Sequence, residues 1–105
     1  MRQSSEILRG IFEFQPIDGN WKPLDHLLDE LWSIGTPSKE SLQILFEVFE
    51  RFPEDDGAGV LWSIVHGVES LPYDYEALLR QSHSRVPSLM ARIMLTRLAN
   101  TTKTG

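Results

Sequence analysis

The residues of this chain best suited to acid–base chemistry are its three histidines, because imidazole titrates near neutral pH. His66 follows Trp62 by four residues and precedes Glu69 by three, so all three can share one helical face. On that face Glu69 could orient His66 as a general base, with Ser63 as a nucleophile. A helix interior supplies neither an oxyanion hole nor a nucleophile elbow. Catalysis is therefore not expected, and His66 is either a partner contact or a surface residue at the rim of the core.

Metal binding would need a cluster of ligands, and two groups of residues come into question. Asp25, His26 and Asp29 form one group, and His66 with Glu69 forms the other. Neither group has the paired helical motifs of a carboxylate-bridged site or the two-histidine spacing of a zinc protease. The chain has no cysteine, so thiolate sites and disulfides are excluded as well. We expect no metal and no cofactor.

Gly57 and Gly59 stand at the start of an expected helix, which is the setting of many phosphate sites. A phosphate site at such a place needs a Lys or Arg nearby and no acidic side chains that compete with the phosphate. Three acids, Glu54, Asp55 and Asp56, stand immediately before the glycines instead. They complement the positive end of the helix that follows, so this stretch is expected to repel phosphate.

Acidic residues are concentrated in the first half of the chain. Residues 1–57 hold twelve Asp/Glu and five Lys/Arg, a net charge of −7, whereas residues 58–105 hold three and five, a net of +2. The sum is the chain's net charge of −5. An acidic half repels nucleic acid and attracts basic proteins, so a protein partner is expected rather than nucleic acid.

A partner-binding surface is predicted around these acids, with aromatic side chains beside them as anchors. The alternative is that the acids only provide solubility and cap helices. The residues predicted to bind a partner are Glu47, Glu50, Glu54, Asp55, Asp56, Trp62, His66, Tyr73 and Asp74.

Helices must position these residues, because no alternating stretch of useful length suggests a strand. Apolar spacing and breaks predict five or six helices in an all-α domain. The first is short and begins near Ser4, the next three lie near 24–34, 37–52 and 58–70, a fifth follows Asp74, and a sixth opens in the stretch 84–88 around Pro87. Ser4 or Ser5, Thr36, Asp55 or Asp56, and Asp74 are the expected caps. The expected inward residues include Ile7, Leu8, Ile11, Phe12, Leu24, Leu27, Leu28, Leu31, Leu78, Leu79, Leu89, Ile93 and Leu98.

The length of the chain predicts a single domain, which we expect over residues 1–98, followed by a flexible tail over 99–105. The sequence Leu-Trp-Ser-Ile occurs at 31–34 and again at 61–64, so stacked helical hairpins of the HEAT type compete with an irregular bundle. The first residues lack the apolar run of a secretory signal, and no segment approaches the roughly 20 apolar residues that cross a bilayer. We expect a soluble, cytoplasmic protein.

Two segments resemble a family of small helical immunity proteins, which bacteria encode beside polymorphic toxins such as those of contact-dependent growth inhibition. Residues 56–69 read DGAGVLWSIVHGVE, and residues 73–100 read YDYEALLRQSHSRVPSLMARIMLTRLAN. The shared features are an Asp-Gly before a Trp-x-Ile-x-His helix, a Tyr-x-x-x-Leu-Leu helix, and a Ser-x-x-Pro-Ser element before a last helix. The resemblance covers under half of the chain, and the N-terminal half lies outside it.

The resemblance implies a non-enzymatic immunity protein that binds one cognate toxin domain, as a monomer in a 1:1 complex in the cytoplasm. The expected toxin is a basic nuclease, an RNase rather than a DNase, whose active site the acidic surface would cover. The positions that match the family are expected to be structural, so the contacts are predicted from charge. Two other classes remain open: a helical adaptor for an ordinary cellular partner, and a small hydrolase that uses His66 with Glu69.

Overall fold

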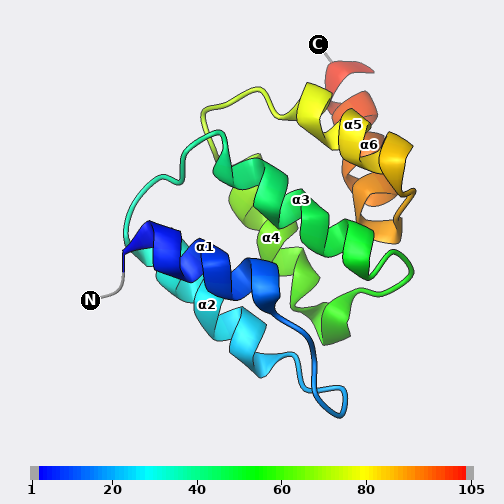
Figure 1. The fold of residues 1–105 in the computed structure, drawn as a ribbon. Coiled ribbons are helices and arrows are strands. Elements are labelled where there is room, and N and C mark those ends of the chain that lie inside the picture. Colours follow the sequence, from blue (N-terminus) through cyan, green and yellow to red (C-terminus); the bar gives the residue numbers. More distant parts are fainter. Residues whose placement is uncertain (1–2, 104–105) are drawn as a thin grey trace.

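The computed structural model describes residues 3–103, which fold into six α-helices and one short 3-10 helix (Figure 1). The elements are α1 (Ser4–Glu13), α2 (Lys22–Ser33), α3 (Ser41–Arg51), η1 (Gly57–Gly59), α4 (Leu61–Glu69), α5 (Glu76–Arg85) and α6 (Leu89–Lys103). Within the described range the only extended pairing is an isolated bridge between Ile17 and Asn20. The predicted all-α class is confirmed.

The helices form three antiparallel hairpins, α1/α2, α3/α4 and α5/α6, stacked side by side (Figure 1). α3 packs against both α1 and α5, and α4 packs against both α2 and α6. The odd-numbered helices therefore form one layer and the even-numbered helices the other, which is the arrangement of stacked helical hairpins.

The four-letter echo that suggested stacking is not itself a structural repeat. Its first copy lies at the end of α2, with Leu31 as the tenth of twelve residues, whereas Leu61 begins α4. The two leucines are both buried, but they occupy opposite ends of neighbouring helices in the same layer. Of the two architectures that the sequence leaves open, the structure has the stacked hairpins, although the motif that suggested them does not occupy equivalent positions.

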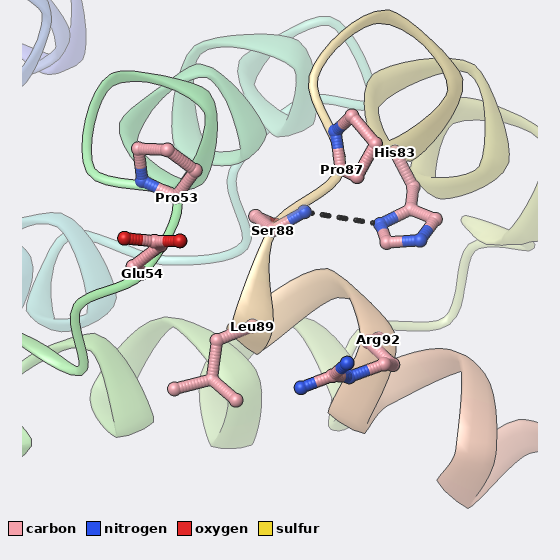
Figure 2. Close-up of a pocket in the computed structure, with 7 residues that line it drawn as sticks. All are labelled: Pro53, Glu54, His83, Pro87, Ser88, Leu89 and Arg92. Atoms are coloured by element: carbon pink, nitrogen blue, oxygen red, sulfur yellow. Dashed lines mark hydrogen bonds between the residues drawn. The ribbon is translucent and has the colours of Figure 1, made fainter.

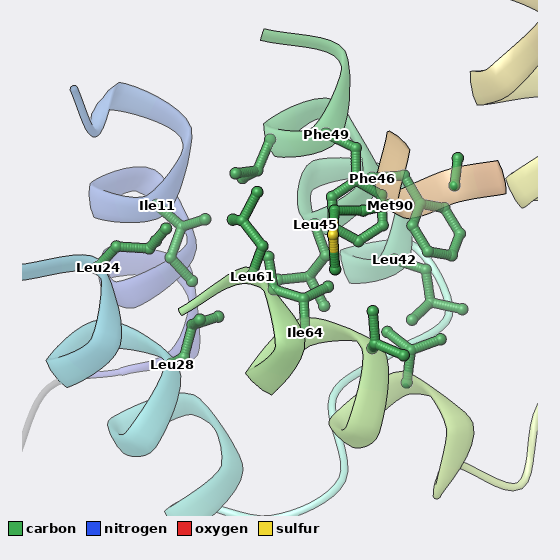
Figure 3. Packing of buried hydrophobic residues seen from close by; sticks show 14 of the residues in the cluster. Ile11, Leu24, Leu28, Leu42, Leu45, Phe46, Phe49, Leu61, Ile64 and Met90 are labelled. Carbon is green, nitrogen blue, oxygen red and sulfur yellow. The ribbon is translucent and has the colours of Figure 1, made fainter. Parts of the chain in front are cut away.

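Each helix buries one apolar stripe in the space between the two layers (Figure 3). The largest fully buried side chains are Ile7, Ile11, Leu24, Leu28, Leu31, Leu42, Leu45, Phe46, Phe49, Leu61, Ile64 and Leu79. The stripe predicted for α2 is confirmed, since Leu24, Leu28 and Leu31 are buried and Leu27 packs at the margin. The prediction for Phe12 is wrong: its side chain is 55% exposed, because α1 turns only Ile7 and Ile11 into the core.

Three predicted boundaries are corrected by the structure. α3 begins at Ser41 rather than after Pro37, because Pro37 is buried in the connection and a turn over Ser38–Ser41 intervenes. The helix expected from residue 58 is divided, with η1 preceding α4. The supposed tail is helical from residue 99 to Lys103, where α6 ends, and residues 104–105 lie outside the described part.

α6 is also rotated from its predicted orientation. Its fully buried residues are Met90, Ala91 and Met94, whereas the predicted Leu89, Ile93 and Leu98 pack only partly against the core. The apolar residues of this helix cover more than one face, so spacing alone does not determine which stripe is buried.

The connections inside the hairpins gather at one side of the stack (Figure 1). We define the turn edge as residues 14–21, 52–60 and 86–88, which join the two helices of each hairpin. The connections between hairpins, residues 34–40 and 70–75, lie at the opposite edge. The two kinds of connection lie at opposite edges because antiparallel hairpins are stacked in the same orientation.

Candidate functional site

An acidic turn, defined as Glu54, Asp55 and Asp56, lies in the middle of the turn edge, and all three residues are exposed. None of them has an ion-pair partner among the side chains that the structure describes. The Asp55 carboxylate accepts the Gly57 N–H at 2.9 Å, which shapes the turn. The Asp56 main-chain carbonyl accepts the Leu61 N–H at 3.2 Å. The prediction that an aspartate side chain caps α4 is wrong, because this helix has no side-chain cap.

Aromatic packing holds the acidic turn on the side of the first hairpin. The Trp21 ring meets Phe52 edge-to-face with centroids 5.0 Å apart, and it meets Phe14 at 5.6 Å. Gly57 allows close approach here, since a Cβ at this position would lie 3.0 Å from Cε3 of Trp21. Because Phe52 directly precedes Pro53 and Glu54, this cluster fixes where the acidic turn begins.

A backbone hydrogen bond holds the acidic turn on the side of the third hairpin. The Leu89 N–H donates to the Pro53 carbonyl at 2.7 Å, which joins the turn to the start of α6. Ser88 caps α6: its hydroxyl accepts the Ala91 N–H at 3.2 Å, and its own N–H donates to Nδ1 of His83 at 3.2 Å. The turn is thus fixed from both neighbouring hairpins.

A pocket of about 390 Å³ lies between the acidic turn and the start of α6 (Figure 2). It is lined by Pro53, Glu54, His83, Pro87, Ser88, Leu89 and Arg92. The Glu54 carboxylate and the Arg92 guanidinium bring opposite charges to it, and Leu89 and the two prolines contribute apolar surface. The pocket can receive a side chain from another protein. Nδ1 of His83 already accepts the Ser88 N–H, and the Ser88 hydroxyl already accepts the Ala91 N–H.

Glu50 does not contribute a free charge to the predicted patch. Its carboxylate binds Arg85 at 2.9 Å and accepts the Ser82 hydroxyl at 2.7 Å, and its side chain is only 13% exposed. Burial alone would raise the pKa of Glu50, but the hydrogen bonds from Arg85 and Ser82 and the charge of Arg85 lower it overall. Glu47 is half-buried one turn earlier on α3, so the predicted five-carboxylate patch reduces to the acidic turn.

Tyr73 and Asp74 do not border the acidic turn as predicted. They lie at the opposite edge, and the whole of α4, which at 1.5 Å per residue is about 13 Å long, separates the two loops. Asp74 is used locally, because its carboxylate accepts the Glu76 N–H at 3.1 Å just before α5. The N-cap of α5 is Tyr75 and not Asp74 as predicted, and no side chain caps this helix. Tyr73 packs against the core.

Trp62 and His66 do lie together, on the outward side of α4, with their rings 5.8 Å apart. Glu69 cannot serve His66, because Arg97 binds its carboxylate at 2.7 and 2.9 Å. Over the described residues, no group of three His, Cys, Asp or Glu is placed to hold a metal ion. His66 therefore lacks the carboxylate partner that the predicted acid–base pair on α4 would need.

Two residues of the turn edge escaped sequence reasoning. Ile17 is 76% exposed, and Asp18 follows it at the tip of the first hairpin. The Asp18-Gly19 pair is typical of a turn, but nothing in the sequence indicates that this turn lies on the same edge as the acidic turn.

Comparison with protein-family models, with curated proteins and with solved structures finds no match to this chain. None of the helices in the described part has both the length and the apolar composition that a membrane-spanning segment requires.

Proposed function

We propose that this protein is an immunity protein, which binds and neutralises one cognate toxin domain in the cytoplasm. The toxin is a basic nuclease, an RNase rather than a DNase, and the acidic turn covers its active site in a 1:1 complex. The observation that carries the proposal is that Glu54, Asp55 and Asp56 are exposed, without ion-pair partners in the described structure, and held from both sides.

Rigidity matters because a surface that is already ordered loses little conformational entropy on binding. The Trp21–Phe52 contact and the Leu89–Pro53 hydrogen bond provide that order here. Opposite charge accelerates association, whereas apolar contacts slow dissociation. Carboxylates held in this way suit the phosphate-binding cleft of a nuclease, where they would take the place of substrate phosphates.

The test is to reverse the charge of the acidic turn with Glu54→Lys, Asp55→Lys and Asp56→Lys together. Binding to the purified C-terminal domain of the toxin encoded immediately upstream should weaken on the order of 100-fold at low salt. The loss should shrink at high salt, because screening reduces the repulsion. The helical circular dichroism spectrum should not change.

A matched control reverses three exposed carboxylates elsewhere: Glu6→Lys, Asp29→Lys and Glu40→Lys. This variant has the same net charge as the first, but its changes lie on α1, α2 and the opposite edge. It should retain affinity within a few-fold. Equal losses in both variants would mean that only net charge matters, and an unchanged affinity in the first variant would remove the acidic turn from the mechanism.

Stacked helical hairpins also serve as adaptors, so a helical adaptor remains the second candidate. The two candidates differ in whether they protect a cell from the toxin. An immunity protein restores growth to cells that express the upstream toxin domain, whereas an adaptor does not. Failure of the unmodified chain both to bind that domain and to restore growth would favour the adaptor.

A further inference from the structure

Ile17 is the most exposed of the large apolar side chains described, at 76%. It begins a tight turn in which the Asn20 N–H donates to the Ile17 carbonyl at 2.9 Å. Asp18 and Gly19 have φ of 53° and 73°, the positive values that a type I′ turn requires at its two central positions. Such a turn makes no demand for isoleucine at its first position, so turn formation does not explain this side chain.

The Ile17 turn is rigidly joined to the acidic turn. Asn20 accepts the Lys22 N–H at 3.1 Å with its side chain, and Trp21 between them is almost fully buried. The same Trp21 packs on Phe52, next to the acidic turn. Ile17 is therefore an apolar projection on a fixed support, and not part of a loose loop.

The charged residues within the turn edge are all acidic. The three segments of the turn edge contain four acids, Asp18, Glu54, Asp55 and Asp56, and no Lys or Arg. Of the bases that end the adjoining helices, Arg51 donates to main-chain carbonyls of the first hairpin and Arg85 binds Glu50. Lys22 and Arg92 are the other bases close by, so an acidic balance remains.

We infer that the turn edge is a composite docking surface, in which Ile17 enters an apolar pocket of the partner while the acidic residues contact a basic rim around it. The occupant is a basic protein domain with an apolar recess, because the acidic residues complement a basic surface and burial of the exposed Ile17 side chain in such a recess would be favourable. This inference rests on the proposed function and extends it, since it adds the first hairpin to the contact surface. Interfaces commonly have this form, with an apolar anchor at the centre and a polar rim.

The experiment compares Ile17→Ser with Ile34→Ser in binding to the upstream-encoded toxin domain, by calorimetry at low and high salt. Ile34 is the matched control, because it is also an exposed isoleucine, at 39%, but it follows α2 at the opposite edge. Ile17→Ser should weaken binding on the order of 30-fold at both salt concentrations, as loss of an apolar hot spot does. Ile34→Ser should stay within about 3-fold, Ile17→Val should retain most of the affinity, and the thermal unfolding of Ile17→Ser should match the unmodified chain.

The outcomes separate the two proposals. If the unmodified chain binds the toxin domain and Ile17→Ser binds equally well, the composite surface is wrong and the immunity function stands. If Ile17→Ser and Ile34→Ser lose affinity equally, the effect is not local to the turn edge, and the inference is likewise overturned. If the unmodified chain does not bind, the proposed function fails and the inference fails with it.

Discussion

Arg51 at the end of α3 donates a hydrogen bond from Nη1 to the main-chain carbonyl of Phe14 at 2.8 Å. Its Nη2 donates to the carbonyl of Ile11 at 2.8 Å, so one guanidinium satisfies two carbonyls at the C-terminal end of α1. The same group lies 5.7 Å from the centre of the Phe52 ring. Burial lowers the pKa of Arg51, and the charge of Glu47 offsets this only in part. The residue joins the first two hairpins directly beside the acidic turn.

Replacing Arg51 by methionine should therefore destabilise the protein by about 1–2 kcal/mol, since two charged hydrogen bonds are lost and the carbonyls must find water. Urea unfolding measures the effect. Arg9→Met is the control, because the Arg9–Glu13 pair is 3.5 Å apart and highly exposed, so its loss should cost less than about 0.5 kcal/mol. Equal costs would show that Arg51 does not join the hairpins.

Gly67 on α4 lies under the indole of Trp32 from α2, and a Cβ at this position would overlap that ring. Gly67→Ala should thus lower the free energy of unfolding by about 1–3 kcal/mol, despite the higher helix propensity of alanine. Gly10→Ala is the control, since its Cβ would meet only the flexible end of Leu27, at 3.1 Å. In a double-mutant cycle with Trp32→Leu, the cost of Gly67→Ala should largely disappear. An unchanged cost would rule out the overlap.

Stability should depend on pH through Glu50. Its pKa in the folded protein lies below the ordinary value of 4.5, because the bonds from Arg85 and Ser82 outweigh the effect of burial. The stabilisation is therefore complete above pH 4.5 and is lost as the pH falls through the lower, folded value. Chemical unfolding should show Glu50→Gln to be less stable than the unmodified chain at pH 7, with the difference narrowing as the pH falls below 4.5. If the difference in stability between the two proteins stayed the same from pH 7 to below pH 4.5, Glu50 would not be the source of the pH dependence.

Gly57 and Gly59 differ in their surroundings, although both have positive φ, of 61° and 89°. Alanine at either position should cost about 1 kcal/mol of backbone strain. At Gly57 the Cβ would also lie 2.9 Å from Cγ of Leu61 and 3.0 Å from Trp21, whereas at Gly59 nothing lies within 4 Å. Gly57→Ala should therefore be the more destabilising by about 1–3 kcal/mol and should change the near-UV circular dichroism of tryptophan. Equal costs would show that packing at Gly57 is loose.

Local features of the fold could be predicted because they depend on neighbours three or four residues apart. The apolar spacing of Leu24, Leu28 and Leu31 predicts the buried stripe of α2, and the break around Pro87 predicts where α6 begins. The wrong predictions concern how a helix is oriented toward other helices. Apolar spacing predicts Phe12 in the core, although α1 buries only the stripe that faces its two neighbouring helices. Helix amphipathicity indicates that a stripe is buried but leaves its orientation uncertain by a residue or two.

From its sequence alone, this chain is an acidic, all-helical protein with three consecutive carboxylates before a glycine-rich turn. Which carboxylates remain without a partner was decided only by the tertiary structure, because Arg85 binds Glu50 from 35 residues away and Arg97 binds Glu69 from 28 residues away. The tertiary structure also brought Ile17 to the edge that carries Glu54–Asp56 and placed Tyr73 at the other. The physical reason is that spacing along a chain encodes helical faces, whereas ion pairs between residues of different hairpins, and edges that several hairpins share, arise only when the hairpins stack.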